Sequence, residues 1–193
     1  MSLSVNPEIN IIKKFVAGDD DAYSVIYHTY AKELYSYGRG LGFGTDAVKD
    51  AIQDLFYTIL CKRRLLADVI NIKYYLFRAL KNRLLNLERS SDFSREELNN
   101  ETGFHISITA LDKMIDDEER IALEKRIQDL LNCLTSRQKE AVYLRYINEL
   151  SYEEIADLLN MTPPSVRNLI SRAIDRMRKD NVLTLFMSLV LSL

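Results

Sequence analysis

Apolar residues recur along most of the chain at the spacing of one helix face. Between residues 19 and 38 the apolar positions are Tyr23, Ile26, Tyr27, Tyr30, Leu34 and Tyr37. Intervals of three and four residues place side chains on one side of an α-helix and not on one side of a strand. The same spacing predicts further helices over residues 9–16, 46–61, 71–89, 121–134, 135–147, 152–159 and 163–178. We therefore expect an all-α protein.

Residues that favour helix boundaries stand where this pattern begins and ends. Side chains able to cap a helix N-terminus are Asp19, Asn71, Thr135, Ser151 and Thr162. After Thr135 and Ser151, Gln or Glu follows at the three-residue spacing of a capping box. Two prolines follow Thr162, and proline is tolerated there because the amides of the first turn lack helical partners. The glycines at positions 38, 40, 42 and 44 are expected to end the helix that Asp19 begins.

The periodicity is lost over residues 90–109, which are mainly polar and resemble a linker. We therefore expect two small helical domains joined by a flexible acidic linker. The expected bounds are 1–90 for the first domain, 91–115 for the linker and 116–180 for the second domain. An apolar tail follows over 181–193. Its thirteen residues fall short of the ~20 that a membrane-spanning helix needs, so we expect no membrane insertion. We expect a final helix packed on the second domain, and hypothesise that it covers a groove also used by a partner.

The distribution of charge indicates more than the total. Lys and Arg number 26 against 28 Asp and Glu, for a net charge of −2. Basic residues dominate over 62–89 and 167–179, and acidic residues dominate over 92–120. Two basic blocks around an acidic middle favour two polyanion-binding faces joined by a solvated segment. The alternative is that each block is an ordinary solvated helix face.

No arrangement of residues indicates catalysis. Cys61 and Cys133 lie far apart, His28 and His105 are isolated, and neither metal-ligand nor phosphate-loop spacing is present. The carboxylates over 116–119 are a solvated run and not an acid–base pair. We expect no enzyme, no metal and no cofactor. No secretory signal is present, so we expect a cytoplasmic protein.

The segment over 150–178 predicts a helix-turn-helix. A short helix, a tight turn at 160–162 and a longer helix with a polar, basic outer face match that arrangement. The major groove accepts one helix, whose exposed face must offer donors to base edges and cations to phosphates. Arg167, Asn168, Ser171 and Arg172 share such a face, and Arg176 and Arg178 are better placed for phosphates. The alternative is an amphipathic hairpin with a solvated basic face.

This part of the sequence, together with runs in the first half of the chain, resembles a known family. The runs LTSRQKEAVYLRYI (134–147), LSYEEIADLL (150–159) and SVRNLISRA (165–173) are similar to the fourth conserved region of bacterial RNA polymerase sigma factors of the sigma-70 family. The closest branch is the extracytoplasmic-function (ECF) type. In the first half, FVAGDDDAY (15–23) resembles the start of the second region, and DAIQDLF (50–56) resembles its polymerase-docking helix. NIKYYLFRALKN (71–82) resembles the helix that faces the minus-ten promoter element.

The resemblance implies a transcription initiation factor whose partners are core RNA polymerase, promoter DNA and an anti-sigma factor. Implied polymerase contacts are Asp50, Gln53 and Asp54, with Leu55 and Phe56 packing nearby. Implied contacts to the opened minus-ten strand are Lys62, Arg63, Arg64, Tyr74, Arg78, Lys81 and Asn82, because cations and aromatic rings suit single strands. The minus-thirty-five element would be read by Arg167, Asn168, Ser171 and Arg172, with Arg176 and Arg178 on the upstream duplex.

The chain departs from the family pattern in a few places. It has no tryptophan, Leu60 stands where relatives often carry one, and Pro163 and Pro164 replace a more usual glycine-containing pair. Two other functions remain open from the residues alone. One is a helix-turn-helix regulator that acts without being a polymerase subunit. The other is a helical module that binds only proteins, such as an antagonist of a sigma factor.

Overall fold

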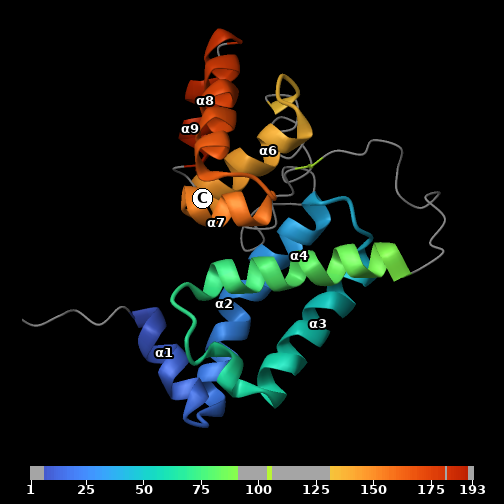
Figure 1. Cartoon of the computed structure of the whole chain (residues 1–193), viewed down its shortest axis with the longest axis vertical. Helices are drawn as coiled ribbons and strands as arrows, with labels where there is room; N and C mark the ends of the chain where they lie inside the picture. The colour runs from blue at the N-terminus through green and yellow to red at the C-terminus, as the bar shows by residue number, and fades with distance from the viewer. Residues whose placement is uncertain (1–6, 91–103, 106–130, 181, 191–193) are drawn as a thin grey trace, which may run out of the picture. The chain divides into compact units, whose positions relative to one another are not determined.

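The chain divides into two compact helical units (Figure 1). The computed structural model describes residues 7–90, 104–105, 131–180 and 182–190 of the 193-residue chain. Within those ranges no residue lies in a strand, and the predicted all-α class is confirmed. Unit 1 comprises residues 1–38 and 45–93, and unit 2 comprises residues 39–44 and 94–193.

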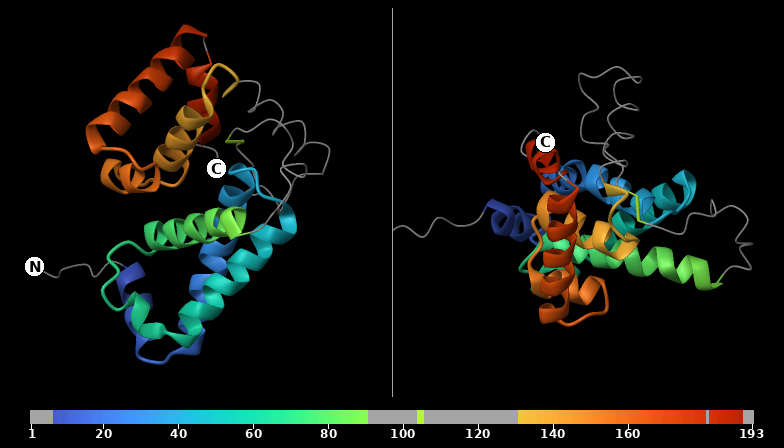
Figure 2. Two further views of the ribbon diagram at one scale, coloured as in Figure 1. Left: turned by 45° about the vertical axis from the view of Figure 1, so that its right-hand side comes forward. Right: turned by 90° about the horizontal axis from the view of Figure 1, so that it is seen from above.

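Unit 1 is a helical bundle. Its described elements are α1 (Pro7–Val16), α2 (Asp20–Gly40), α3 (Thr45–Cys61), the 3₁₀ turn η1 (Arg63–Leu66) and α4 (Ile72–Ser90). α4 packs against α3, and α1 packs against η1, as the two views of Figure 2 allow the reader to follow. The last two residues of α2 belong to unit 2.

Two of the predicted caps begin helices of unit 1. Asp19 Oδ1 accepts hydrogen bonds from the backbone N–H of Asp21 and Ala22 at 2.9 and 3.2 Å. Asn71 Oδ1 accepts from the Tyr74 N–H at 3.1 Å. Each cap supplies an acceptor for amides that have no partner in the first helical turn.

The predicted apolar stripes form the core of unit 1. Its fully buried side chains include Phe15, Ile26, Leu34, Tyr37, Phe56, Ile59, Leu76, Phe77 and Leu80. Leu87, also on α4, is 44% exposed. It lies in the last turns of the helix, beyond Leu84, which is the final fully buried leucine of the stripe.

The prediction that Gly38 and Gly40 break the second helix is wrong. Both glycines continue α2, and the chain turns at Gly42. The φ of Gly42 is +92°, a backbone conformation that glycine adopts at little cost. The Gly42 N–H donates to the Arg39 carbonyl at 2.9 Å. Gly38 serves close packing, because a Cβ there would lie 2.7 Å from Val48 Cγ1 of α3.

Unit 2 holds the second helical group. Its described elements are α6 (Ser136–Val142), the π-helical turn η2 (Tyr143–Ile147), α7 (Tyr152–Leu158), α8 (Pro163–Lys179) and α9 (Leu183–Val190). The single helix predicted over 135–147 is therefore divided. At its end the Asn148 N–H donates to the Tyr143 carbonyl at 3.2 Å, five residues back, and Glu149 follows with a φ of +59°. A wider turn of this kind inserts one extra residue into the helix.

Local hydrogen bonds define the turn between α7 and α8. Asn160 has a φ of +50°, and Asn tolerates this left-handed conformation better than most residues. The Met161 N–H donates to the Ala156 carbonyl at 2.8 Å and the Asn160 N–H to the Asp157 carbonyl at 3.2 Å, the pair of bonds of a Schellman motif. Arg137 of α6 donates to the Leu159 carbonyl at 2.6 Å and ties α6 to the end of α7. The turn between α7 and α8 is thus held by backbone bonds and one arginine.

The apolar tail forms α9, which lies along α8 (Figure 1). Phe186 is 1% exposed, and the Val182 N–H donates to the Met177 carbonyl at 2.9 Å. The expected final helix packed on the second helical group is present. Most of the predicted helix over 121–134, the acidic run over 116–119 and most of the predicted linker lie outside the described residues.

Candidate nucleic-acid interface

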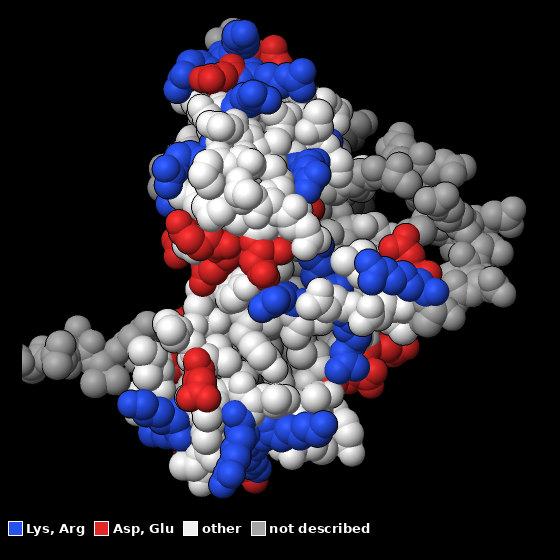
Figure 3. Space-filling model, in the orientation of Figure 1, with Lys and Arg blue, Asp and Glu red and all other residues white. Residues whose placement is uncertain are grey.

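The outward face of α8 carries the polar residues predicted to contact duplex DNA. Arg167, Asn168, Ser171, Arg172, Arg176 and Arg178 are all exposed. The opposite face, made by Val166, Ile170, Ala173 and Met177, is buried. Figure 3 shows Lys and Arg side chains over the C-terminal end of α8, where the last turn carries three basic residues. The cationic face of this helix is open to solvent and available to a polyanion.

The start of α8 is fixed by its own sequence. The Thr162 side chain accepts from the Ser165 N–H at 3.4 Å, and the two prolines occupy the first helical positions. The capping boxes predicted at Thr135 and Ser151 are both present, with each side chain accepting from the N–H three residues on. Each helix of this unit that follows a predicted cap therefore begins where the sequence indicates.

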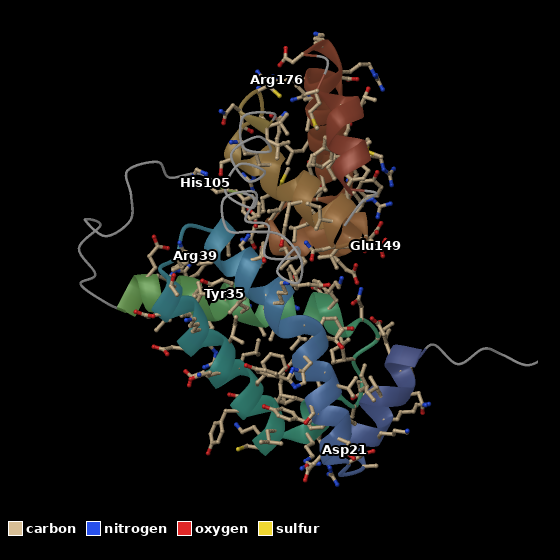
Figure 4. The ribbon with its side chains drawn as sticks, turned by 180° about the vertical axis from the view of Figure 1, so that it is seen from behind. Asp21, Tyr35, Arg39, His105, Glu149 and Arg176 are labelled. Atoms are coloured by element: carbon tan, nitrogen blue, oxygen red, sulfur yellow. The ribbon has the colours of Figure 1, made fainter. Side chains whose placement is uncertain are left out.

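The arginines at the end of α8 have partners within unit 2. Arg178 Nη1 lies 3.2 Å from Asp175 Oδ1, and both side chains are more than half exposed. Arg176, labelled in Figure 4, donates from Nη1 to the Cys133 carbonyl at 3.3 Å. The exposed ion pair of Arg178 is weak, so this arginine keeps most of its capacity to contact phosphate.

A hollow of about 530 Å³ opens along one flank of α8. It is lined by Thr135, Gln138, Leu169, Arg172, Asp175, Arg176 and Lys179. Three cations against one carboxylate make the hollow electropositive. Because Arg172 and Arg176 also belong to the outward face of α8, the positive surface extends from that face toward the start of α6.

An aromatic ring in contact with two cations lies next to this face. The Arg167 guanidinium lies 5.0 Å from the centre of the Tyr152 ring, and that of Arg145 lies 4.8 Å from the same ring. Both distances are within the range of a cation–π contact. Arg145 also donates to the Leu150 carbonyl at 2.8 Å.

Neither Arg145 nor Tyr152 was predicted from the sequence as a functional residue. Tyr152 is the first residue of α7 and is only partly buried. Arg145 lies in the π-helical turn, so no regular helical spacing relates it to Tyr152 or Arg167. The one usable signal was that a tyrosine opens the first helix of the helix-turn-helix.

In unit 1, α3 has a polar outer face. Asp50, Gln53 and Asp54 are exposed, while Leu55 and Phe56 are buried. Arg83 of α4 donates to Asp54 Oδ2 at 3.2 Å and to Thr58 Oγ1 at 3.1 Å. The residues predicted to bind a protein thus lie on one surface, over the two apolar residues predicted to pack beneath them.

The basic residues after α3 differ in their surroundings. Lys62 and Arg64 are exposed. Arg63 instead donates to Asp20 Oδ1 at 2.6 Å, and its guanidinium lies 5.3 Å from the centre of the buried Phe15 ring. Arg63 therefore joins this turn to α1 and α2, and the bundle itself uses its charge.

The remaining predicted contacts lie on α4. Arg78 and Asn82 are exposed, and Tyr74 and Lys81 are half-buried. The turn before α4 also exposes Ile70, which is 86% accessible, and Leu65, which is 43% accessible. Periodicity drew no attention to these two apolar side chains because they precede the regular part of the helix.

Ionisation and metal binding add little to this surface. Burial raises the pKa of the Cys133 thiol above its ordinary value, and the Asp180 carboxylate raises that pKa further. In the part of the chain that the structure describes, no group of three His, Cys, Asp or Glu residues could hold a metal ion. Among the same residues, no helix combines the length and the apolar character needed to cross a membrane.

Comparison with known proteins places these features in a family context. The model of the family "Sigma-70, region 4" matches residues 124–177, which include α6, α7 and most of α8. The ECF RNA polymerase sigma factor SigW of Bacillus subtilis (strain 168) is 25% identical over 187 residues. That alignment covers 93% of this chain and 97% of SigW.

Two solved structures share the fold. CnrH, solved in complex with the cytosolic domain of CnrY, aligns with a TM-score of 0.57 and 19% identity, covering 90% of this chain and 96% of CnrH. The sigma factor RpoE of Bartonella quintana, solved with the anti-sigma factor NepR, aligns with a TM-score of 0.53 and 22% identity. It covers 81% of this chain and 94% of RpoE.

Proposed function

This chain belongs to the sigma-70 family, in its ECF type, and from that premise we propose that it binds core RNA polymerase and directs it to specific promoters. The observation that carries the proposal is the exposed cationic face of α8, which follows a hydrogen-bonded turn inside the region matched by the family model. Such a helix suits the major groove, where its donors reach base edges.

We assign the binding of the upstream promoter duplex to unit 2. Arg167, Asn168, Ser171 and Arg172 read the minus-thirty-five element, and Arg176 and Arg178 contact its phosphates. All six side chains are exposed, which supports this assignment. The electropositive hollow beside α8 extends the surface that meets the DNA backbone. Residues 116–180 form the corresponding domain.

We assign core polymerase and the opened minus-ten strand to unit 1. Asp50, Gln53 and Asp54 bind polymerase, while Leu55 and Phe56 hold α3 in place from the core. The strand is met by Lys62, Arg64, Tyr74, Arg78, Lys81 and Asn82. For Arg63, the ion pair with Asp20 favours a role in holding the turn that presents its two basic neighbours. Residues 1–90 form this domain, and 91–115 link it to the second.

The protein acts by binding and not by catalysis, and it works in the cytoplasm, where polymerase and the chromosome lie. A further partner is an anti-sigma factor. Support for this partner comes from the two structures of similar fold, one solved with an anti-sigma factor and the other with the cytosolic domain of a second protein.

Reconstitution tests the proposal. The full chain is added to core polymerase, and initiation is measured on a promoter library. We expect transcripts from a subset of promoters. Combined Asp50→Ala and Asp54→Ala should weaken polymerase binding, while Glu88→Ala, an exposed acid on α4, serves as the matched control. No promoter-dependent transcript would refute the function, and specific duplex binding without polymerase would favour the regulator instead.

The tail carries a further prediction of its own. If α9 covers a groove that polymerase also uses, deleting the chain from Val182 onward should tighten polymerase binding. The deletion removes the buried Phe186, so circular dichroism must show that the helices are retained. Unchanged affinity in a folded deletion variant would contradict the hypothesis.

A further inference from the structure

We propose that Tyr152 is a positioning residue that orients Arg167 for base recognition, with Arg145 as a second, fixed cation over the same ring. The inference rests on the proposed function, because it concerns how the α8 face reads a duplex. It assigns a role to a ring that contacts α8 from another helix. It also predicts that base specificity depends on a residue outside the outward face of α8.

The contacts define a cluster of three side chains. The Arg145 guanidinium lies over the Tyr152 ring, 4.8 Å from its centre, and the Arg167 guanidinium lies over the same ring, 5.0 Å from its centre. The three side chains come from three elements, namely η2, α7 and α8. A face of an aromatic ring attracts one cation, and a planar guanidinium can lie flat upon it.

The ring is held in place by its own helix. Tyr152 is the first residue of α7, directly after the capping box of Ser151 and Glu154. The Ser151 N–H donates to Glu154 Oε2 at 2.8 Å, and the Glu154 N–H donates to Ser151 Oγ at 3.2 Å. These reciprocal bonds fix the backbone from which the ring projects, so the ring can act as a rigid support.

Arg145 is held in the same way, and Arg167 is not. The Arg145 guanidinium donates to the Leu150 carbonyl at 2.8 Å, so a hydrogen bond and the ring both hold it. Arg167 is exposed, and among the described residues no carboxylate or carbonyl accepts a hydrogen bond from its guanidinium. The cluster therefore restrains the direction of Arg167 while its donors stay available.

This arrangement favours recognition over simple attraction. A long arginine side chain loses conformational freedom when it binds a base in one geometry. A side chain already confined against a ring loses less on binding, so the correct base gains affinity. Phosphate attraction depends little on side-chain direction, because charge acts without a required geometry. Losing the ring should thus reduce discrimination between bases more than total affinity.

Four variants test the coupling. They are Tyr152→Leu, Tyr152→Phe, Arg167→Ala and the double variant Tyr152→Leu with Arg167→Ala, all in the full chain. Phe keeps the ring and loses only the hydroxyl, so it is the matched control for Leu. Thermal melts measure any change in folding. Discrimination is measured as the ratio of holoenzyme transcription between a preferred promoter and its single-base variants in the upstream element.

We expect Tyr152→Leu to lower that ratio about two- to fivefold and Tyr152→Phe to leave it near wild type. In the Arg167→Ala background, Tyr152→Leu should change the ratio no further. Two results would overturn the proposal. One is an equal effect of Tyr152→Leu with and without Arg167, and the other is a Phe variant as impaired as the Leu variant.

A second arm separates this inference from the proposed function. The same four proteins select sites from a randomised duplex pool without polymerase, and the enriched bases are sequenced. If the wild-type chain fails to direct transcription but selects duplexes, the proposed function fails and the Tyr152 coupling is still measured here. If the wild-type chain does neither, both proposals are overturned.

Discussion

Two arginines of this chain, Arg63 and Arg167, were both predicted to contact DNA, and their surroundings differ. Each guanidinium lies over an aromatic ring. That of Arg63 is 5.3 Å from the centre of the Phe15 ring, and that of Arg167 is 5.0 Å from the centre of the Tyr152 ring. Arg63 also forms an ion pair with Asp20, at 2.6 Å between Nη2 and Oδ1, and its ring partner Phe15 is fully buried. Arg167 is exposed above a partly buried ring. One cation thus serves the bundle, and the other remains available to a partner.

Basic residues of one sequence are therefore not equally available to contact a partner. In unit 1, polar side chains are used to join helices, as Arg63 joins η1 to α2 and Arg83 joins α4 to α3. On α8 the outward cations have weaker partners, such as the exposed ion pair of Arg178. The variants described next test this difference, from the largest expected effect to the smallest.

The largest expected effect comes from the two aromatic rings. Phe15 is fully buried and lies 5.9 Å from the Tyr23 ring, so Phe15→Ala should destabilise the protein by about 3–5 kcal/mol. Tyr152→Ala, at a partly buried ring, should cost less than half as much. Urea unfolding followed by circular dichroism measures both. Equal costs would mean that the two rings play the same structural role.

The next prediction is that substitutions of Arg167 and Arg63 affect different quantities. Arg167→Ala should lower discrimination among upstream promoter bases by about 1–3 kcal/mol. It should leave stability within about 0.5 kcal/mol of wild type. Arg63→Ala should do the reverse, lowering stability while upstream discrimination is kept. Competition between promoter variants gives the first quantity and urea unfolding gives the second. Loss of upstream discrimination in Arg63→Ala would break the comparison.

A third effect appears at alkaline pH, at another polar contact inside unit 1. The Tyr30 hydroxyl donates to Glu8 Oε1 at 2.7 Å, and burial first, then this bond, raises the pKa of Tyr30 far above its ordinary value of 10. In the unfolded chain the phenol ionises near pH 10, while the folded phenol stays protonated. The stabilisation of the folded state by the protonated Tyr30 phenol is therefore fully present below pH 10 and is lost as the pH rises further.

The loss can reach about 1.4 kcal/mol per pH unit for one proton. Unfolding free energies at pH 8, 10 and 11 should fall less steeply in Tyr30→Phe than in wild type. Tyr23 and Tyr75, whose pKa values burial also raises, contribute to the slope that remains. An unchanged slope in the variant would show that Tyr30 ionises equally in both states.

The smallest effect concerns the ion pair of Arg63. The Asp20 side chain is 80% exposed and that of Arg63 is 27% exposed, so solvent screens their attraction. Asp20→Asn should cost about 0.2–1 kcal/mol, and high salt should reduce the difference from wild type. Asp21→Asn, next in the chain and also exposed, is the matched control for charge at the start of α2. A cost of several kcal/mol would show that Asp20 is more than a surface partner.

The sequence alone determined the features that depend on neighbours within about four residues. The caps at Asp19, Asn71, Thr135, Ser151 and Thr162 are present because a side chain and the amides it accepts from lie in one turn. The buried stripe of α8 and its exposed polar face follow from helical spacing in the same way. These local rules predicted the helix-turn-helix and which of its residues face outward.

Tertiary structure decided what depends on distant residues. Arg63 and its partner Asp20 are 43 residues apart, and only the folding of unit 1 brings them together. Tyr152 meets Arg145 and Arg167 because the fold of unit 2 brings three separate elements, η2, α7 and α8, together. Gly38 lies within a helix, although glycine at this position predicted a break. The structure shows why a glycine is there, because Val48 packs directly against it. Spacing along the chain cannot specify such contacts, because they depend on how whole helices pack against one another.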